Sequence, residues 1–154
     1  MENLEKKLTT LSHIAKEFNE KNVTWAVGAS MLLYFKGIAS EFHDIDLMVA
    51  EEDVEIVKDL LLSFGSIKAP NPNIKYKTKY FLEFVVDGID IDVMAGFIIV
   101  NKDEDFYFPL KKENINDYTV VNEIKIPLQS VEEWSYYYDL MGRDEKVKMI
   151  DASL

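Results

Sequence analysis

Two segments of the sequence alternate aspartate with apolar residues in the way that a β-strand requires: DIDLMV, which begins at Asp44, and IDIDVM, which begins at Ile89. Side chains two residues apart on a strand lie on the same face. One face of each segment is therefore apolar and suited to a core. The other face carries Asp44 and Asp46 in the first segment, and Asp90 and Asp92 in the second. If the two strands are neighbours in one sheet, three or four carboxylates meet on one face.

A group of carboxylates at such close range requires a cation. Like charges raise one another's pKa and destabilise the fold unless a positive ion lies between them. The sequence has no cysteine and only two histidines, so the ligands would be hard oxygen atoms, which suit Mg²⁺ or Mn²⁺. Two such ions can hold a triphosphate and activate an attacking hydroxyl. The alternative interpretation of each Asp-x-Asp pair is a solvated strand face without a ligand.

The turn Gly28-Ala29-Ser30 lies between the strand-like run VTWAV and the apolar run SMLLYFK. A strand-to-helix turn offers free backbone N–H groups to an anion, and Ser30 adds a hydroxyl donor. We therefore expect Gly28 and Ser30 to hold phosphate groups. The need for a tight turn would also explain Gly28 without any ligand.

Helices are predicted at both ends of the chain, with short strands between them. Helices follow from apolar periodicity and end signals, and strands from β-branched runs bounded by turn residues. The fold class that this order predicts is α+β (mixed α/β), in a single domain over residues 1–154. The predicted helices span 3–20, 30–36, 51–64 and 131–141, with a last short helix from Arg143; the predicted strands span 23–27, 44–49, 75–86 and 89–94, followed by FIIV, DFYF and a hairpin in YTVVNEIKIPL that turns near Asn122.

Three local signals mark turns and a helix start. Asp87-Gly88 predicts a tight hairpin between the strands on either side of it. Ser130 and Glu133 predict a capping box at the start of the fourth helix. The segment APNPN, residues 69–73, predicts a loop.

The charge balance limits the partners that the protein can bind. The formal net charge is −11, and this field repels nucleic acid, so we do not expect the chain to bind long DNA or RNA. No apolar run approaches the length of a membrane span, and no leader opens the chain, so we expect a cytoplasmic protein. The 48% of hydrophobic residues is enough for a buried core.

One basic strip stands out in this acidic chain: between Ser66 and Leu82 there are four lysines and no acid, namely Lys68, Lys75, Lys77 and Lys79. The last three alternate onto one strand face, as a phosphate contact would need, and Lys77 is the candidate that we select. Lysines also protect exposed sheet edges, which is the alternative interpretation. Arg143 follows a helix break at Gly142 and is a second candidate for binding phosphate, or for pairing with a nearby acid.

The ordered combination of these motifs resembles a known family. Gly28-Ala29-Ser30, Gly37, the run His43-Asp44-Ile45-Asp46-Leu47 and the run Ile91-Asp92-Val93 resemble the nucleotidyltransferase fold that is shared with DNA polymerase β. The sequence is most similar to small bacterial nucleotidyltransferase-like proteins, including lincosamide-resistance and abortive-infection toxin relatives. The resemblance extends from Val23 to about Ile150.

The resemblance implies a role for each matching residue. Ser30, seven residues before Gly37, matches the second residue of the family's Gly-Gly or Gly-Ser turn. Asp44 and Asp46 match the Asp-x-Asp metal ligands. Asp92 matches the third acid, which completes the metal site and helps to deprotonate the nucleophile. The implied reaction is metal-dependent transfer of a nucleoside monophosphate from a nucleoside triphosphate to a hydroxyl of a small acceptor.

Three departures from the family pattern keep another interpretation open. Ala29 stands where the family usually has glycine, and Ser40 and Phe42 replace an arginine and a threonine that often precede the Asp-x-Asp. The alternative is a catalytically degenerate module of the same fold that binds a nucleotide or regulates a partner. A metal-dependent phosphohydrolase is a third candidate. The chain is short for the family, and this predicts a homodimer in which a second subunit completes the substrate cleft.

Overall fold

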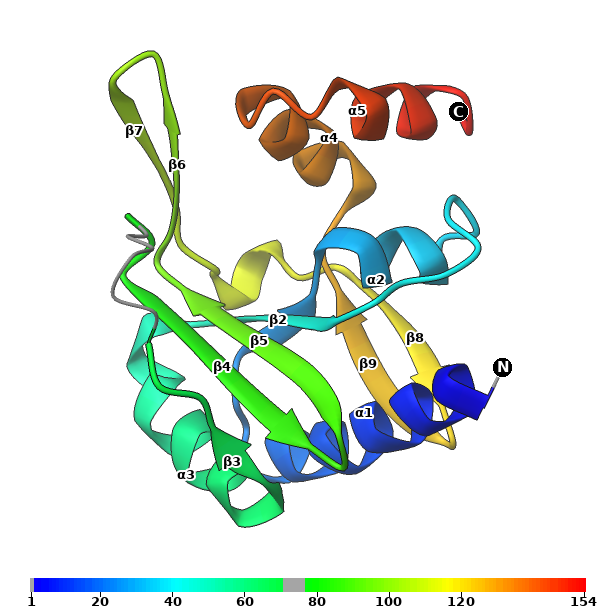
Figure 1. The fold of residues 1–154 in the computed structure, drawn as a ribbon, viewed down its shortest axis with the longest axis vertical. Coiled ribbons are helices and arrows are strands. Elements are labelled where there is room, and N and C mark those ends of the chain that lie inside the picture. Colours follow the sequence, from blue (N-terminus) through cyan, green and yellow to red (C-terminus); the bar gives the residue numbers. More distant parts are fainter. Residues whose placement is uncertain (1, 71–76) are drawn as a thin grey trace.

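The computed structural model describes residues 2–70 and 77–154 and shows an α+β fold (Figure 1). The helices are α1 (Glu2–Glu20), α2 (Ala29–Phe35), α3 (Val54–Phe64), α4 (Val131–Leu140) and α5 (Asp144–Asp151), with short 3-10 turns η1 (Glu51–Asp53) and η2 (Lys112–Asn114). The strands are β1 (Trp25–Val27), β2 (Ile45–Val49), β3 (Ser66–Ile67), β4 (Tyr80–Val86), β5 (Ile89–Ala95), β6 (Phe97–Asn101), β7 (Glu104–Phe108), β8 (Asp117–Val121) and β9 (Ile124–Leu128).

Seven of these strands form one mixed sheet in the order β3-β4-β5-β2-β1-β9-β8, and β6 and β7 form a separate hairpin. Two strand pairs in this sheet are parallel, β2 with β5 and β1 with β9. Strands β1 and β2, which lie between them, are antiparallel to each other. Strand β2, which carries Asp46 and directly follows Asp44, is therefore hydrogen-bonded to the strand that carries Asp92, so the condition stated from the sequence is met.

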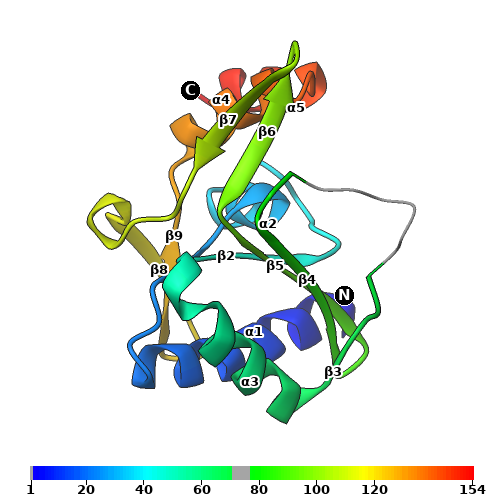
Figure 2. The same cartoon turned by 90° about the vertical axis from the view of Figure 1, so that its left-hand side faces the viewer.

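The two faces of the sheet are covered by different parts of the chain. Helices α1 and α3 lie together on one side of it, and α4, α5 and the β6–β7 hairpin lie on the other (Figures 1 and 2). The apolar face predicted for the two acidic strands packs toward the first layer. This core contains completely buried residues of both strands and helices: Ile45, Leu47, Val49, Ile91, Val93, Leu11, Ile14, Phe18, Val57 and Leu61.

Most of the predicted elements are confirmed to within two residues. The Asp87-Gly88 turn joins β4 to β5, with positive φ at both residues (54° and 76°), which is the backbone of a two-residue hairpin turn. The turn near Asn122 joins β8 to β9 in the same way. The capping box at the start of α4 is also present, since Ser130 and Glu133 exchange side-chain and backbone hydrogen bonds.

Two element boundaries and one additional strand differ from the prediction. Strand β4 begins at Tyr80 instead of residue 75, and residues 77–79 have no regular structure. The predicted helix 51–64 begins as the 3-10 turn η1 before α3. The two-residue strand β3 was not predicted, because a pair of residues carries no periodicity. Lys75, and residues 71–73 of the predicted loop, lie outside the described residues.

Among the described helices, none is both long enough and apolar enough to cross a membrane.

Candidate active site

Asp46 and Asp92 are direct neighbours on the face of the sheet opposite the core of α1 and α3. They are paired in the parallel register of β2 and β5, in which Ile45 lies beside Ile91 and Leu47 beside Val93. Parallel strands in register point equivalent side chains to the same side. Asp44 lies one residue before β2, in a bend, and is partly buried like the other two carboxylates.

The crowding of these acids changes their affinity for protons. Burial raises the pKa of Asp46 to about 8, and the charges of Asp92 and then Asp44 add to the rise. Burial likewise raises the pKa of Asp92 to about 6, and the charges of Asp44, Glu83 and Asp90 raise it further, while Lys68 opposes them. Burial and negative charge therefore outweigh the nearby positive charge at these two acids, and a bound cation would relieve this imbalance.

Glu83 is a fourth acid beside this pair. The hairpin register of β4 and β5 places it directly opposite Asp92. The sequence already contained the signal, because a two-residue turn at Asp87-Gly88 fixes the register and brings residue 83 opposite residue 92. Asp90 lies further along β5 and forms an ion pair with Lys68, with 2.9 Å between Oδ1 and Nζ.

The donor set suits a divalent cation by its chemistry, since it consists of carboxylate oxygens with raised pKa values. The side chains themselves are not gathered into a closed site. Within residues 2–70 and 77–154, no group of three or more His, Asp or Glu side chains is placed so that it could hold a metal ion. The structure thus brings the acids to one face, as expected, without the convergence of three carboxylates that a complete metal site needs.

A cleft of about 370 Å³ opens in front of Asp44 and Asp46. One wall comes from the Gly28 turn and the segment before β2, and the other from α4 and the start of α5. The residues that line it are Ala29, Ser30, His43, Asp44, Asp46, Met94, Phe97, Trp134, Tyr138, Met141, Arg143 and Lys146. The cleft therefore combines a pair of acids, two basic side chains and an aromatic wall, as a nucleotide-sized ligand requires.

The aromatic wall is fixed by contacts within it and by a buried polar contact. Trp134 donates a hydrogen bond of 2.6 Å from Nε1 to Oε1 of Gln129, and its ring centroid lies 5.8 Å from that of Phe97 and 5.3 Å from that of Tyr138. Burial raises the pKa of Tyr138 to about 12, with the charge of Asp46 as the next contribution. Tyr138 therefore keeps its hydroxyl proton beside the acids at neutral pH.

In the turn at residues 28–30, from which two phosphate-binding residues were predicted, only Ser30 of these two faces the cleft. Ser30 lines the cleft, but Gly28 is buried behind it. A Cβ atom added at Gly28 would lie 2.4 Å from Oε1 of Gln129 and 2.7 Å from the ring of Trp134, so close packing alone requires glycine there. Ala29 adopts a left-handed backbone with φ of 52°, a conformation that glycine adopts without cost and that alanine does not.

The predicted basic residues have different positions. Arg143 lines the cleft, with its guanidinium 6.0 Å from the centroid of the Tyr138 ring, and it donates a 2.6 Å hydrogen bond from Nε to Oε1 of Glu145. Lys77 is exposed and is not among the residues that line the cleft. Lys79 pairs with Glu51 at 3.2 Å, and its Nζ lies 4.6 Å from the centroid of the Tyr107 ring. Lys146, which the sequence interpretation did not select, lines the cleft instead.

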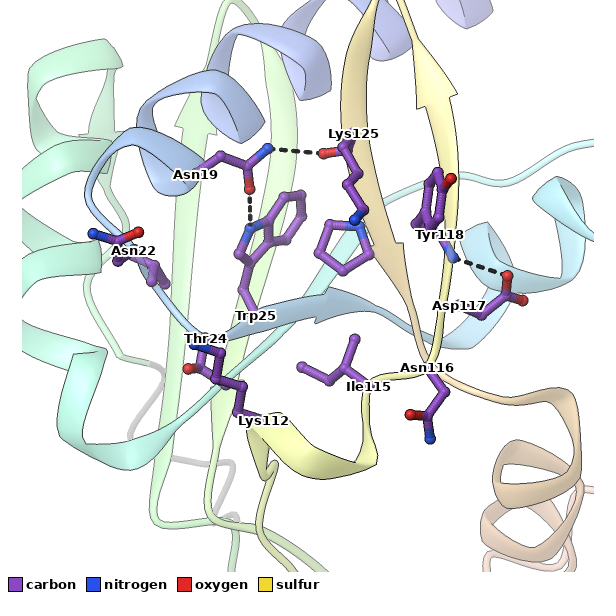
Figure 3. Close-up of a pocket in the computed structure, with 12 residues that line it drawn as sticks. Asn19, Asn22, Thr24, Trp25, Lys112, Ile115, Asn116, Asp117, Tyr118 and Lys125 are labelled. Carbon is purple, nitrogen blue, oxygen red and sulfur yellow. Dashed lines mark hydrogen bonds between the residues drawn. The ribbon is translucent and has the colours of Figure 1, made fainter.

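A larger cavity of about 600 Å³ lies at the other end of the short strand β1 (Figure 3). In it, Asn19 accepts a 3.0 Å hydrogen bond from Nε1 of Trp25 and donates one of 2.9 Å to the carbonyl of Lys125. It shares no lining residue with the cleft, and Asp117 is the one acid that lines it. We place the candidate site in the smaller cleft because the coupled carboxylates Asp44 and Asp46 line that one.

No protein-family model matches the sequence, and no curated protein matches it. Solved structures do match the fold over nearly the whole chain. The proposed nucleotidyltransferase TM1012 of Thermotoga maritima superposes with a TM-score of 0.74 at 23% identity, over 96% of this chain and 92% of that one. The chain has the nucleotidyltransferase fold. The resemblance inferred from the Gly28 turn and the Asp-x-Asp motif is thereby confirmed at the level of the fold.

Two further structures with the nucleotidyltransferase fold were solved with small molecules bound. ANT(2″)-Ia, in complex with adenylyl-2″-tobramycin, has a TM-score of 0.64 and 12% identity over 96% of this chain and 89% of that chain. The lincosamide antibiotic adenylyltransferase LnuA, bound to lincomycin, has a TM-score of 0.60 and 18% identity over 92% of this chain and 94% of that chain. At these identities the similarity establishes the nucleotidyltransferase fold alone.

Proposed function

We propose that the protein transfers a nucleoside monophosphate from a nucleoside triphosphate to a hydroxyl group of a small acceptor. The observation that carries this proposal is the position of Asp46 beside Asp92 on adjacent parallel strands, at a cleft that Asp46 lines together with Ser30 and Arg143. The nucleotidyltransferase fold supports it, and so does the small-molecule chemistry of two proteins that share the fold.

In this reaction, the acceptor oxygen forms a bond to the α-phosphorus, the bond from that phosphorus to the bridging oxygen breaks, and pyrophosphate leaves. Asp92 accepts the proton of the acceptor hydroxyl. Without a bound cation, burial raises the pKa of Asp92 to about 6, so this carboxyl group is mostly ionised at neutral pH. A Mg²⁺ or Mn²⁺ ion bound by Asp44, Asp46 and Asp92 would neutralise negative charge on the phosphates.

The other residues of the cleft would bind the substrates. Ser30 donates a hydrogen bond from its hydroxyl to a phosphate oxygen, and Gly28 allows the turn that places Ser30 at the cleft. Arg143 and Lys146 offer positive charge from the opposite wall. Of the predicted phosphate-binding set, Lys77 and Gly28 lie outside the lining of the cleft.

The experiment is a pyrophosphate-release assay with each nucleoside triphosphate in the presence of Mg²⁺ or Mn²⁺ and a panel of small hydroxylated acceptors. ATP comes first because one protein of this fold was solved with an adenylyl product and another is named an adenylyltransferase. Tobramycin and lincomycin come first among the acceptors, because adenylyl-2″-tobramycin and lincomycin were bound in those structures. We expect release that depends on both the metal ion and the acceptor, and that is lost in the Asp46→Asn variant. Full activity of that variant would contradict the assignment.

Two observations favour a second candidate function, a nucleotide-binding module without catalysis. The described acids do not form a group of three that could hold a metal ion, and Ala29 replaces a turn glycine. Calorimetry with each triphosphate and Mg²⁺ separates the two functions. Heat of binding without pyrophosphate release from any acceptor would favour the module, while turnover would exclude it.

A further inference from the structure

The two edges of the seven-stranded sheet differ in how they are protected. The edge strand β3 has only two residues, and the Lys68 that follows it is ion-paired with Asp90. The other edge strand, β8, has five residues with the sequence DYTVV, which contains no glycine, proline or lysine. Sheet edges are normally short, charged or interrupted, since a regular free edge pairs with other chains. Strand β8 therefore has the properties of an edge that is used for pairing.

Strand β8 also exposes apolar side chains that a covered surface would bury. Tyr118 is 55% exposed and Val120 is 58% exposed, on the same face of the strand. Tyr118 belongs to the rim of the cavity in Figure 3, where Nζ of Lys125 lies 4.3 Å from the centroid of its ring. Val120 lies opposite Lys125 in the hairpin, and Tyr118 lies opposite Pro127. The exposed face of the hairpin is thus mostly apolar up to its free edge.

The hairpin turn decides which backbone groups of β8 are free. Val121 and Ile124 flank a two-residue turn, and Asn122 and Glu123 both have positive φ. In such a hairpin the flanking residues exchange hydrogen bonds, and alternate residues along the strand do the same. Thr119 and Asp117 therefore direct their backbone groups to β9, while Tyr118 and Val120 direct theirs to the edge of the sheet. At that edge the N–H of Tyr118 donates a 2.8 Å hydrogen bond to Oδ1 of the adjacent Asp117.

These edge groups match those of a second copy of the same strand. In an antiparallel pairing centred on Thr119, Tyr118 lies opposite the partner's Val120, and each such pair exchanges two backbone hydrogen bonds, with the N–H of Tyr118 leaving Asp117 for the partner's carbonyl. Aromatic residues opposite β-branched residues stabilise antiparallel pairs, and so do two facing threonines. All five residues of β8 find a partner in this register. The sequence of the strand is thus complementary to itself.

The charges at this seam are compatible with the pairing. The one charged residue of β8, Asp117, lies opposite the partner's Val121 in this register and is paired with Lys36 of its own subunit. No like charges therefore face each other across the seam. The net charge of −11 on each subunit still opposes association at long range, so the affinity should increase with salt concentration.

We infer that the protein forms a two-fold symmetric dimer in which β8 pairs antiparallel with β8 of a second copy. A two-fold axis through Thr119 makes the interface isologous, with one continuous sheet across both subunits. Strand β8 contributes no residue to the cleft at Asp44 and Asp46, so this inference is independent of the proposed function. It also places the interface elsewhere than the cleft-completing dimer predicted from the length of the chain.

Sedimentation velocity of the full chain over a range of protein and salt concentrations tests the dimer. We expect a monomer–dimer equilibrium that shifts toward dimer with added salt. Val120→Lys should weaken it at least about tenfold, because lysine on an edge strand opposes pairing. Val100→Lys on β6, where Val100 is 48% exposed, is the matched control: each variant has the same net charge of −10 (−11 + 1), and the control should dimerise like the unchanged chain. A chain that stays monomeric at every concentration and salt, or a Val120→Lys variant that dimerises normally, would overturn the inference.

A cysteine cross-link tests the register. The chain has no cysteine, so Thr119→Cys introduces a single thiol per subunit. Facing residues that do not exchange hydrogen bonds have Cα atoms about 4.5 Å apart, within the range that a disulfide spans. We expect Thr119→Cys to form a disulfide-linked dimer on mild oxidation and Val120→Cys, which is displaced from the axis, to do so far less. Equal cross-linking of both variants would contradict the register, and with it the self-complementarity on which the inference depends.

Discussion

Asp46 and Asp92 are partners in the register of two parallel strands, and at this position burial raises the pKa of both carboxyl groups. A sheet places them side by side whether or not a ligand is bound. The mutual repulsion of the carboxylates is therefore a property of the fold itself, and it can be measured without knowing the substrate.

The first prediction concerns stability and pH in the absence of divalent cations. The folded protein binds a proton at Asp46 more tightly than the unfolded chain does, since the pKa is about 8 in the fold and 3.8 in its absence. The free energy of unfolding should therefore fall as the pH rises from 3.8 to about 8, as linkage requires. Urea unfolding should show that Asp46→Asn raises this free energy above pH 8 by about 1–3 kcal/mol, with little effect near pH 4.

Asp59→Asn on α3 is the control, because it removes an exposed carboxylate on the opposite side of the sheet. Its effect on the free energy of unfolding should be small at every pH. If Asp46→Asn changed the free energy of unfolding above pH 8 by the same small amount, burial and repulsion would not destabilise the carboxylate of Asp46.

The second prediction concerns divalent cations. Mg²⁺ or Mn²⁺ should raise the Tm of the unchanged chain by a few degrees, because a ligand that binds only the folded state stabilises it by mass action. The rise should be lost in Asp46→Asn and in Asp92→Asn. Asp90→Asn is the matched control on the same face of the same strand, since Asp90 is exposed and is paired with Lys68. Thermal unfolding that is unaffected by either ion in the unchanged chain would rule out the site.

The third prediction concerns the turn before α2. Ala29 has a φ of 52°, which costs an L-residue about 1–2 kcal/mol, so Ala29→Gly should raise the free energy of unfolding by about 0.5–1 kcal/mol after the entropy of glycine is counted. Ala152→Gly at an ordinary φ of −66° should lower it slightly. Chemical denaturation compares the two, and a loss of stability in Ala29→Gly would show that the turn is not strained.

The fourth prediction concerns the glycine behind the cleft. Gly28→Ala should lower the free energy of unfolding by about 1–3 kcal/mol, because the added methyl overlaps Gln129 and the ring of Trp134. Gly37 has open space around its Cα, but its φ of 74° also favours glycine, so Gly37→Ala controls for backbone strain without overlap. Near-ultraviolet circular dichroism should report a disturbed Trp134 in the first variant only.

The sequence was sufficient to predict the acidic strands and the arrangement of their faces. Alternation alone placed Asp46 and Asp92 opposite the apolar core residues, and the tight turn at Asp87-Gly88 fixed the register of the second strand. These features are local, with a period of two residues and a turn type that few residues adopt. Because side-chain alternation and turn type depend on a few neighbouring residues, tertiary packing changes them little.

The composition of the cleft was much harder to predict. Phe97 and Lys146 line it, yet they come from a strand and a helix far from Asp46 in the sequence. No short-range pattern encodes such a meeting, because the packing of α4 against the β6–β7 hairpin and of α5 against α4 decides it. Lys77 illustrates the converse: its alternation with Lys79 is regular, but residues 77–79 form no strand, so the face that the alternation implied does not exist.

The Trp134 wall is made by a part of the chain that leaves the ribosome long after the acidic strands. During synthesis, Asp46 and Asp92 can pair while one side of the future cleft is still open to water, and hydration then screens the two charges. The side of Asp46 that faces the cleft is covered only when Trp134 and Tyr138 of α4 pack there. The last helices therefore close the aromatic wall and raise the electrostatic cost of ionising Asp46 in the same folding step.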